Sequence, residues 1–165
     1  VYDPGYVPCG TVNRSTNKAE FYTTWAGKIE TYLAEPQEAN ILLETTFNDQ
    51  TLSLDVKADV EFLVDLSGNY NLCFYVVESG IIAPQLSDTG DIPEYQHEHM
   101  LRDSYGGAWG LEIAAGDITV GDTFTEEFEI IIGSGLVPEE TSVIAFITDA
   151  ATRRVLQAEE KHITE

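Results

Sequence analysis

The sequence has 165 residues, of which 43% are hydrophobic and 10% aromatic, so it is long and apolar enough for one domain with a buried core and is not typical of a disordered chain. Eight lysines and arginines stand against 29 aspartates and glutamates, and the net charge of −21 argues against binding to nucleic acids or anionic membrane surfaces. The sequence has no run of about 18 apolar residues and no basic segment followed by an apolar one at its start, so we expect neither a membrane-spanning segment nor a signal peptide in it.

One amphipathic helix is expected at about residues 18–35, after a short strand at residues 10–14. Apolar side chains recur there with the helical period of about 3.6 residues and are expected to pack against another element. They are Phe21, Trp25, Ile29, Tyr32 and Leu33. Asn17 followed by Glu20 fits an N-terminal capping arrangement, and Pro36 is expected to stop the helix.

The pattern changes to strands after Pro36, with apolar and polar residues alternating almost perfectly from residue 52 to residue 62. The expected strands are residues 41–47, 52–62, 70–78, 97–103, 123–132, 142–148 and 154–162, with turns at residues 48–50, 67–69 and 149–153. Short strands with turn signals at short intervals, and no helices between them, indicate antiparallel sheets. The sequence therefore predicts a mainly β protein, an antiparallel β-sandwich of immunoglobulin-like or jelly-roll-like type, with one N-terminal amphipathic helix.

Three stretches together resemble a known family. They are Glu78-Ser-Gly-Ile-Ile-Ala-Pro-Gln85, the pattern Tyr95-x-His97-x-His99-x-Leu101-Arg102, and Trp109-Gly110. Together they resemble the outer-membrane lipoprotein family named after a twenty-eight-kilodalton outer membrane protein, although that family has Asn where this chain has Glu98. The resemblance implies the outer membrane or cell surface of a Gram-negative bacterium, with the periplasm as second choice, and is compatible with anchoring by an N-terminal lipid.

The resemblance also implies two parts. Residues 1–36 resemble the end of a thioredoxin-like domain, with Val7-Pro8 in the place of its cis-proline, residues 10–14 as its next strand and residues 21–33 as its last helix, and residues 37–165 form the β-sandwich domain. The chain has no CxxC motif, so redox chemistry does not carry over to these residues. Cys9 and Cys73 are far apart in sequence, and their pairing stays open.

The two histidines at positions 97 and 99 are candidate binding residues, together with Tyr95. Residues two apart in a strand share a face, so both imidazoles could reach one metal ion. A metal site usually has three protein ligands, and Asp103 and His162 are weak candidates for a third. We therefore expect these histidines to hydrogen-bond neighbouring strands or loops, and we expect no metal and no cofactor.

Arg102 and Trp109 complete the set of candidate binding residues. Arg102 is expected to form an ion pair with Glu78, whose strand is expected to be adjacent. Trp109 lies among glycines and either forms an exposed aromatic platform for a sugar or peptide or, more often for such a residue, plugs the end of the sandwich. No catalytic residue is expected, because the sequence has no nucleophile elbow.

These features favour a non-enzymatic binding or spacer module of a bacterial cell-envelope lipoprotein, with a protein or glycan partner. Two alternatives stay open. The first is a metal-dependent enzyme that uses His97 and His99, and the second is the client-binding part of a thiol-disulfide envelope protein. The sequence does not indicate an oligomeric state.

Overall fold

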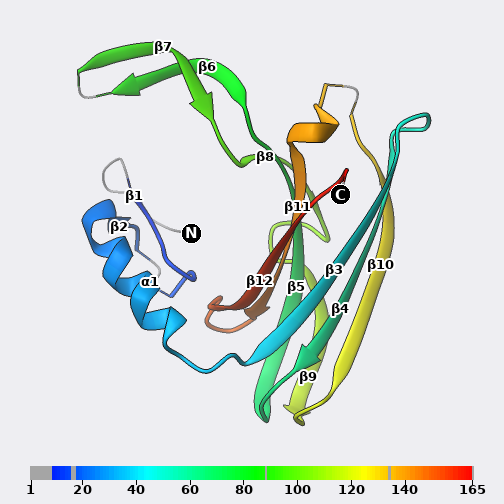
Figure 1. The fold of residues 1–165 in the computed structure, drawn as a ribbon. Helices are drawn as coiled ribbons and strands as arrows, with labels where there is room; N and C mark the ends of the chain where they lie inside the picture. The colour runs from blue at the N-terminus through cyan, green and yellow to red at the C-terminus, as the bar shows by residue number, and fades with distance from the viewer. Residues whose placement is uncertain (1–8, 16–17, 88, 134, 165) are drawn as a thin grey trace.

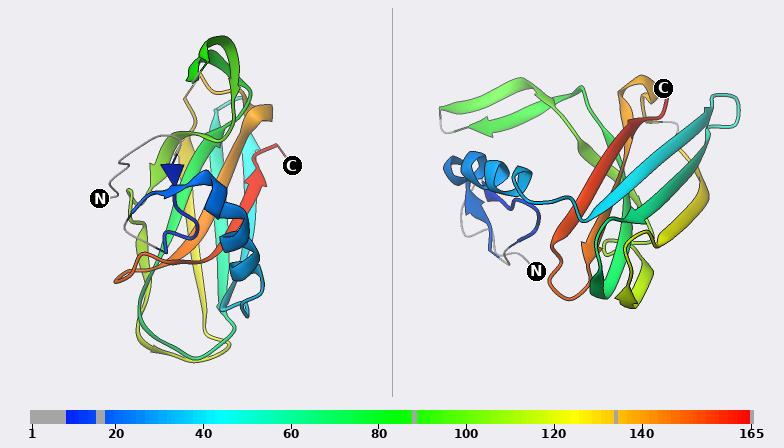
Figure 2. Two further views of the ribbon diagram at one scale, coloured as in Figure 1. Left: turned by 90° about the vertical axis from the view of Figure 1, so that its left-hand side faces the viewer. Right: turned by 60° about the horizontal axis from the view of Figure 1, so that its bottom comes forward.

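The computed structural model describes residues 9–15, 18–87, 89–133 and 135–164. Its main body consists of two antiparallel sheets packed face to face (Figures 1 and 2). One sheet has the order β10-β4-β3, formed by Thr123–Ile131, Ser53–Phe62 and Ala39–Asn48. The other has the order β12-β11-β5, formed by Val155–His162, Thr141–Asp149 and Leu66–Glu78. Both β8 (Met100–Tyr105) and β9 (Leu111–Ile118) pair with the edge of β5 that does not face β11. The predicted β-sandwich with an N-terminal helix is confirmed.

The core lies between the two sheets and is built by alternate residues of each strand. Its fully buried side chains include Leu54, Val56, Val60 and Phe62 from β4, Leu72 and Phe74 from β5, and Val143 and Ile147 from β11. Burying one large apolar side chain contributes about 1.5–3 kcal/mol, so the core is the main source of stability. Edge-to-face ring contacts of Phe62 with Tyr70 and of Phe74 with Phe128 join the two sheets across the core.

Most expected strands of the sandwich are present, with ends shifted by one or two residues. The turn after β3 forms as expected, because the side-chain oxygen of Asn48 accepts the N–H groups of Gln50 at 3.0 Å and Thr51 at 3.2 Å. The expected terminal turn is also present, and Asp149 accepts the N–H group of Thr152 at 2.7 Å. In both turns a short polar side chain satisfies backbone donors that the reversing chain leaves without a strand partner.

The expected turn at residues 67–69 is wrong, because these residues lie inside β5. The strand begins at Leu66, and Gly68 pairs with Gly116 of β9. The polar side chains find partners across the strand pair, since Ser67 donates to Asp117 at 3.2 Å and Asn69 donates to Glu112 at 3.0 Å. Cross-strand hydrogen bonds therefore keep a turn-like sequence extended.

Strands β8 and β9 together take the place of one strand beside β5, with an interruption between them. Tyr105 pairs with Phe74, Leu111 pairs with Leu72, and residues 106–110 leave the sheet as a loop between them. Gly110 closes this loop with a φ of 75°, and a Cβ atom there would lie 2.4 Å from the carbonyl oxygen of Leu72 and 2.7 Å from Sγ of Cys73. The loop therefore needs glycine where its backbone returns to β5.

A two-stranded hairpin, which we call the arm (residues 81–97), projects from the sandwich (Figure 1). It consists of β6 (Ile81–Ser87) and β7 (Gly90–His97), inserted between the neighbouring strands β5 and β8. The strand expected at residues 97–103 is present only from Met100, because β7 ends at His97 and β8 spans Met100–Tyr105. His99 lies between them with a φ of 51°, which breaks the extended run.

The N-terminal elements, which we call the N-terminal unit, lie beside the sandwich on the side from which the arm projects (Figures 1 and 2). β1 (Cys9–Gly10) pairs with β2 (Glu20–Phe21), and a 3₁₀ turn (Tyr22–Thr24) leads into α1 (Trp25–Leu33). The helix expected at residues 18–35 is therefore shorter, and the strand expected at residues 10–14 is Cys9–Gly10. Val7, Pro8 and Asn17 lie outside the described residues.

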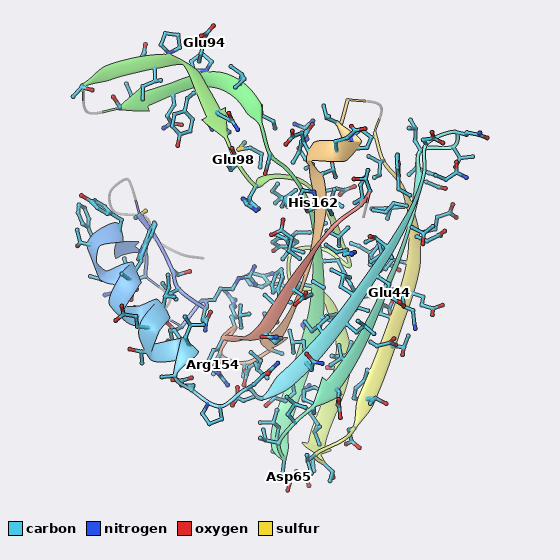
Figure 3. The ribbon with its side chains drawn as sticks, viewed as in Figure 1. Glu44, Asp65, Glu94, Glu98, Arg154 and His162 are labelled. Carbon is cyan, nitrogen blue, oxygen red and sulfur yellow. The ribbon has the colours of Figure 1, made fainter. Side chains whose placement is uncertain are left out.

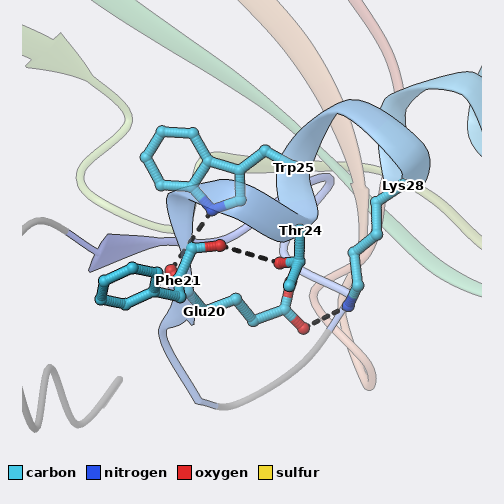
Figure 4. Close-up of polar contacts among 5 residues, drawn as sticks. All are labelled: Glu20, Phe21, Thr24, Trp25 and Lys28. Carbon is cyan, nitrogen blue, oxygen red and sulfur yellow. Dashed lines mark hydrogen bonds and ion pairs between the residues drawn. The ribbon is translucent and has the colours of Figure 1, made fainter.

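Local contacts explain the late start of α1 (Figure 4). The backbone of Glu20 pairs with Gly10, and its carbonyl oxygen accepts the indole N–H of Trp25 at 3.3 Å. The hydroxyl of Thr24 donates to the carbonyl of Phe21 at 2.9 Å, and Lys28 forms an ion pair with the Glu20 carboxylate. These contacts hold Glu20 and Phe21 extended, so the helix begins only at Trp25.

The expectation that the apolar stripe of the helix packs against another element is wrong. No residue of α1 is buried, and Leu33 is 80% exposed. Trp25 and Tyr32 are half-buried, and the ring of Trp25 lies against Gly10. Within the described residues, no helix has the length and apolar character that crossing a membrane requires.

A Gly110→Ala substitution tests the close approach of the 106–110 loop to β5. Clash with Leu72 and the positive φ together are expected to cost about 3 kcal/mol of unfolding free energy, whereas Gly107→Ala, with a φ of 78° and open space around it, is expected to cost about 1 kcal/mol. Urea unfolding followed by circular dichroism measures both variants. Equal losses in the two would contradict the packing of Gly110 on β5.

Candidate functional site

The arm exposes apolar side chains on both of its faces. Its register pairs Ile82 with Gln96 and Leu86 with Asp91, so these residues share one face, which we call the Leu86 face. Ile82 is 58% exposed and Leu86 is 75% exposed. The arm therefore carries large apolar side chains into solvent.

The opposite face of the arm, which we call the Tyr95 face, holds two of the residues expected to bind. The register pairs Ala83 with Tyr95 and Ile81 with His97, and the rings of Tyr95 and His97 meet edge to face with their centroids 4.9 Å apart. Ile92, opposite Gln85, belongs to the same face beyond a register shift between Ala83 and Gln85. The structure thus places Tyr95 and His97 together on the arm.

Polar contacts hold the root of the arm where it leaves the sandwich. The carboxylate of Glu98 accepts the side-chain amide of Gln96 at 2.7 Å and the N–H of Gly80 at 3.2 Å. The hydrogen bond from Gln96 is the main cause, and that from Gly80 the second cause, that the pKa of Glu98 lies below its ordinary value. The N–H of His99 donates to the hydroxyl of Ser79 at 3.1 Å. Figure 3 shows Glu98 at this root and Glu94 farther out on the arm.

His97 and His99 do not share a strand face as the metal hypothesis requires. His97 ends β7 beside Tyr95, whereas Nε2 of His99 lies 3.4 Å from the Glu160 carboxylate of β12. The carbonyl oxygen of His162 accepts the Thr45 hydroxyl at 3.2 Å. Among the described residues, no group of three or more His, Cys, Asp or Glu side chains is placed to hold a metal ion.

The expected ion pair between Arg102 and Glu78 is present. Nε of Arg102 lies 3.3 Å from Oε2 of Glu78, and Oε1 of Glu78 accepts the N–H of Val137 at 2.9 Å. The Glu78 side chain is only 5% exposed, whereas Arg102 reaches the surface from a register shift opposite Val76 and Val77. A β-bulge of this kind re-aims a side chain, and here it directs Arg102 to a buried carboxylate.

Trp109 lies in the 106–110 loop and does not plug the end of the sandwich. The residue is 48% exposed, and the guanidinium of Arg153 lies 4.1 Å from the centroid of its ring. The side-chain amide of Asn71, on the outer face of β5, donates to the Trp109 carbonyl at 2.9 Å. One face of the ring is therefore covered by a cation, as in a cation–π contact, and is not open to a sugar.

Arg14 is a contact residue that sequence reasoning missed. Its Nη2 donates to the hydroxyl of Tyr75 at 3.0 Å, and its guanidinium lies 4.8 Å from the Phe146 ring centroid and 5.9 Å from that of Trp109. Arg14 therefore ties the N-terminal unit to the outer face of the β12-β11-β5 sheet. The sequence does contain one signal for this residue. Lysine and arginine are scarce in so acidic a chain, so an arginine is expected to have a partner.

The apolar residues of the arm were also missed. Ile82, Leu86 and Ile92 belong to segments that each carry a proline, Pro84 and Pro93, and a proline inside a run argues against a strand.

Removing either partner of the Arg102–Glu78 pair is expected to destabilise the sandwich. Arg102→Met leaves the buried Glu78 carboxylate without its cation and is expected to cost about 2 kcal/mol, less than a fully buried pair because Arg102 is partly exposed. Adding Glu78→Gln to this variant is expected to recover at least half of the loss, as measured by urea unfolding. The surface variant Lys57→Met serves as a control, with an expected loss below about 0.5 kcal/mol. If the losses of unfolding free energy from the Arg102 and Glu78 changes were strictly additive, that result would count against the ion pair.

The comparisons with known proteins agree with the resemblance seen in the sequence. A family model described as outer membrane protein Omp28 matches residues 1–165. Similar solved structures include a domain of the outer membrane lipoprotein Omp28 from Porphyromonas gingivalis, at 22% identity and a TM-score of 0.49 over 78% of this chain and 90% of that one. Another is a β-glucosidase from Listeria innocua in complex with isofagomine, at 14% identity and a TM-score of 0.31 over 75% of this chain and 16% of that one.

The same β-glucosidase in complex with glucose aligns at 14% identity and a TM-score of 0.30 over 74% of this chain and 16% of that one. No curated protein matches the sequence. Because the family model spans the whole sequence, the chain belongs to the Omp28 family of outer membrane proteins, a family of the outer membrane or cell surface of Gram-negative bacteria.

Proposed function

We propose that this chain is a non-enzymatic protein-binding module of the bacterial outer membrane and that the arm is its binding element. The observation that carries the proposal is the exposure of Ile82 and Leu86 on a hairpin that projects from the sandwich. Exposed apolar surface of this kind, rimmed by polar residues, marks interaction sites in folded proteins.

The arm contributes nothing to the core, so its apolar side chains have no use within the sandwich. None of the described residues of β6 and β7 belongs to the hydrophobic cluster between the sheets. An isolated two-stranded hairpin is only marginally stable in water. A partner that covers the arm would bury its apolar faces and stabilise it, which supports binding over a purely spacing role.

A protein fits the arm better than a glycan does. Sugars stack on open aromatic faces, but Arg153 covers one face of Trp109, and the ring of Tyr95 is engaged by His97. Aliphatic side chains such as Ile82 and Leu86 suit an apolar protein surface. Of the residues expected to bind, Tyr95 and His97 lie on the arm, on the face opposite Ile82 and Leu86. His99 and Arg102 belong to the root, and Trp109 lies in the 106–110 loop.

We also propose that residues 1–36 and 37–165 are separate units, the first resembling the end of a thioredoxin-like domain. The pairing of β1 with β2 gives the first unit its own small sheet. Its described links to the sandwich include the Arg14 side chain, which donates to Tyr75, and the Asn13 carbonyl, which accepts the Val155 N–H at 2.9 Å. The ion pair of Glu38 with Arg154, a residue labelled in Figure 3, lies within the second unit and holds its first residues to the β11–β12 turn.

A fragment of residues 37–165 is expected to fold alone, because no described residue before Ala39 belongs to the core. Its melting temperature is expected to lie within about 8 °C of that of the full chain, since the loss of the Arg14 contacts is worth about 1–2 kcal/mol. Circular dichroism and thermal melting provide the measurement. An unfolded fragment would contradict the division at residue 36.

The client-binding alternative has one observation in its favour. The arm and the N-terminal unit lie on the same side of the sandwich, so one bound polypeptide could contact both. A longer chain that carries a CxxC motif before residue 1 would support this alternative, and one without such a motif would count against it.

The strand order supports an immunoglobulin-like sandwich rather than a jelly roll. With β8 and β9 taken as one interrupted strand, the described part of the sandwich has seven strands, in the orders β10-β4-β3 and β12-β11-β5-β8/β9. Seven strands divided in this way resemble the immunoglobulin arrangement with its fourth strand moved to the other sheet. An experimental structure that pairs β8 or β9 with β3 or β10 would contradict this assignment.

Photo-crosslinking in the source bacterium tests the binding role of the arm. A benzoylphenylalanine at Leu86 is expected to give one discrete protein adduct, whereas the same probe at Thr46, on the exposed face of β3, is expected to give none. Gel shift followed by mass spectrometry identifies the adduct. Adducts of equal yield at both positions, or none at Leu86, would argue against the arm as the binding element.

A further inference from the structure

The arm combines apolar side chains with charge of one sign only. The sequence has no Lys or Arg from Ala58 to Leu101, a segment that includes the whole arm. The described acidic residues of the arm and its root are Asp91, Glu94 and Glu98. A surface of this kind attracts a partner with positive charge and repels a negative one.

The charge lies directly beside the apolar row. Asp91 is the cross-strand partner of Leu86, the more exposed of the two aliphatic residues on the Leu86 face. Side chains directly opposite in an antiparallel pair share a face and lie close together. A partner that covers Leu86 therefore brings its own side chains close to the Asp91 carboxylate, and lysine or arginine beside an apolar residue is the matching arrangement.

The edges of the arm are poorly suited to strand addition. Pro84 in β6 and Pro93 in β7 have no N–H to donate, and the register shift near Pro84 interrupts the ladder. In the described part of the chain, neither outer edge of the arm pairs with another strand. A partner is therefore expected to contact side chains on a face of the arm rather than extend the sheet.

A second copy of the chain does not fit this site. Two arms would place like charges together, and the net charge of −21 repels a second copy as a whole. The blunted edges also disfavour pairing between two arms.

We propose that the partner of the arm is a protein surface in which lysine or arginine side chains flank an apolar patch, and that it docks on the Leu86 face. This inference rests on the proposed function, because it takes the arm as the binding element. It adds the chemistry of the partner and the mode of contact.

Defined peptides test this chemistry. Three labelled synthetic peptides of equal length serve as probes: alternating Lys and Leu, alternating Lys and Ser, and alternating Glu and Leu. Fluorescence anisotropy at 50 and 200 mM salt measures their binding to the full chain and its variants. The Lys/Leu peptide is expected to bind at least about tenfold more tightly than either of the others, because only it offers both cation and apolar contact.

Matched variants separate the arm from the general acidity of the chain. The double variant Ile82→Ser Leu86→Ser removes apolar surface and is expected to weaken Lys/Leu binding at least about tenfold. Asp91→Asn Glu94→Gln removes two charges and is expected to weaken it about threefold or more. Glu127→Gln Glu129→Gln removes the same charge from the exposed face of β10 and is expected to change binding less than about twofold. Circular dichroism confirms that each variant is folded.

The outcomes distinguish this inference from the proposed function. Equal weakening by the arm and β10 charge variants would overturn the inference, because binding would then follow net charge alone. If the Glu/Leu peptide bound more tightly than the Lys/Leu peptide and its binding depended on Leu86, the inference would also be overturned. The arm would then still be a binding element. Self-association that is lost in the Ile82→Ser Leu86→Ser variant, seen by analytical ultracentrifugation, would assign the face to a second copy. If no arm substitution affects any peptide and Leu86 gives no photo-crosslink, both proposals fail.

Discussion

The pairing of β5 along both of its edges is the constraint on which the rest of the structure depends. One edge pairs with β11 from Tyr70 to Glu78, and the other pairs with β9 and then β8. Alternate side chains of the strand serve two purposes, since Leu72 and Phe74 enter the core while Tyr75 receives Arg14 of the N-terminal unit on the outer face. Because β8 ends opposite Phe74 and β9 begins opposite Leu72, residues 106–110 leave the sheet between these two strands, and Gly110 allows their backbone to return against Leu72.

The same constraint explains why the arm can project. The chain leaves β5 after Glu78 and returns at Met100, which pairs directly with Glu78, so the sandwich is closed without the residues between them. The Glu78–Arg102 ion pair and the Glu98 hydrogen bonds fix the place where the arm departs. A rigid root with an apolar hairpin beyond it suits a binding element, because the side chains of the hairpin contribute nothing to folding and are available to a partner.

The sequence predicts what depends on local chemistry. Alternation from residue 52 to residue 62, the side-chain turns at Asn48 and Asp149, and the adjacency of Glu78 and Arg102 follow from neighbouring residues and chain order. The extension of β5 through Gly68 depends on Asp117 and Glu112, which no local pattern reveals. The arm was missed because Pro84 and Pro93 mimic loop signals, and the covering of Trp109 by Arg153 depends on two loops that meet only in the folded sheet.

The proposed function requires that the free protein holds the arm as an ordered hairpin with its apolar side chains in water. Methyl NMR with a soluble paramagnetic agent tests this most directly. We expect the methyl signals of Ile82 and Leu86 to broaden as strongly as those of exposed Leu33, and those of buried Leu72 and Ile147 to stay sharp. Cross-strand backbone contacts are expected to join β6 and β7. Shielded methyl groups at positions 82 and 86, or no cross-strand contacts between the two strands, would contradict it.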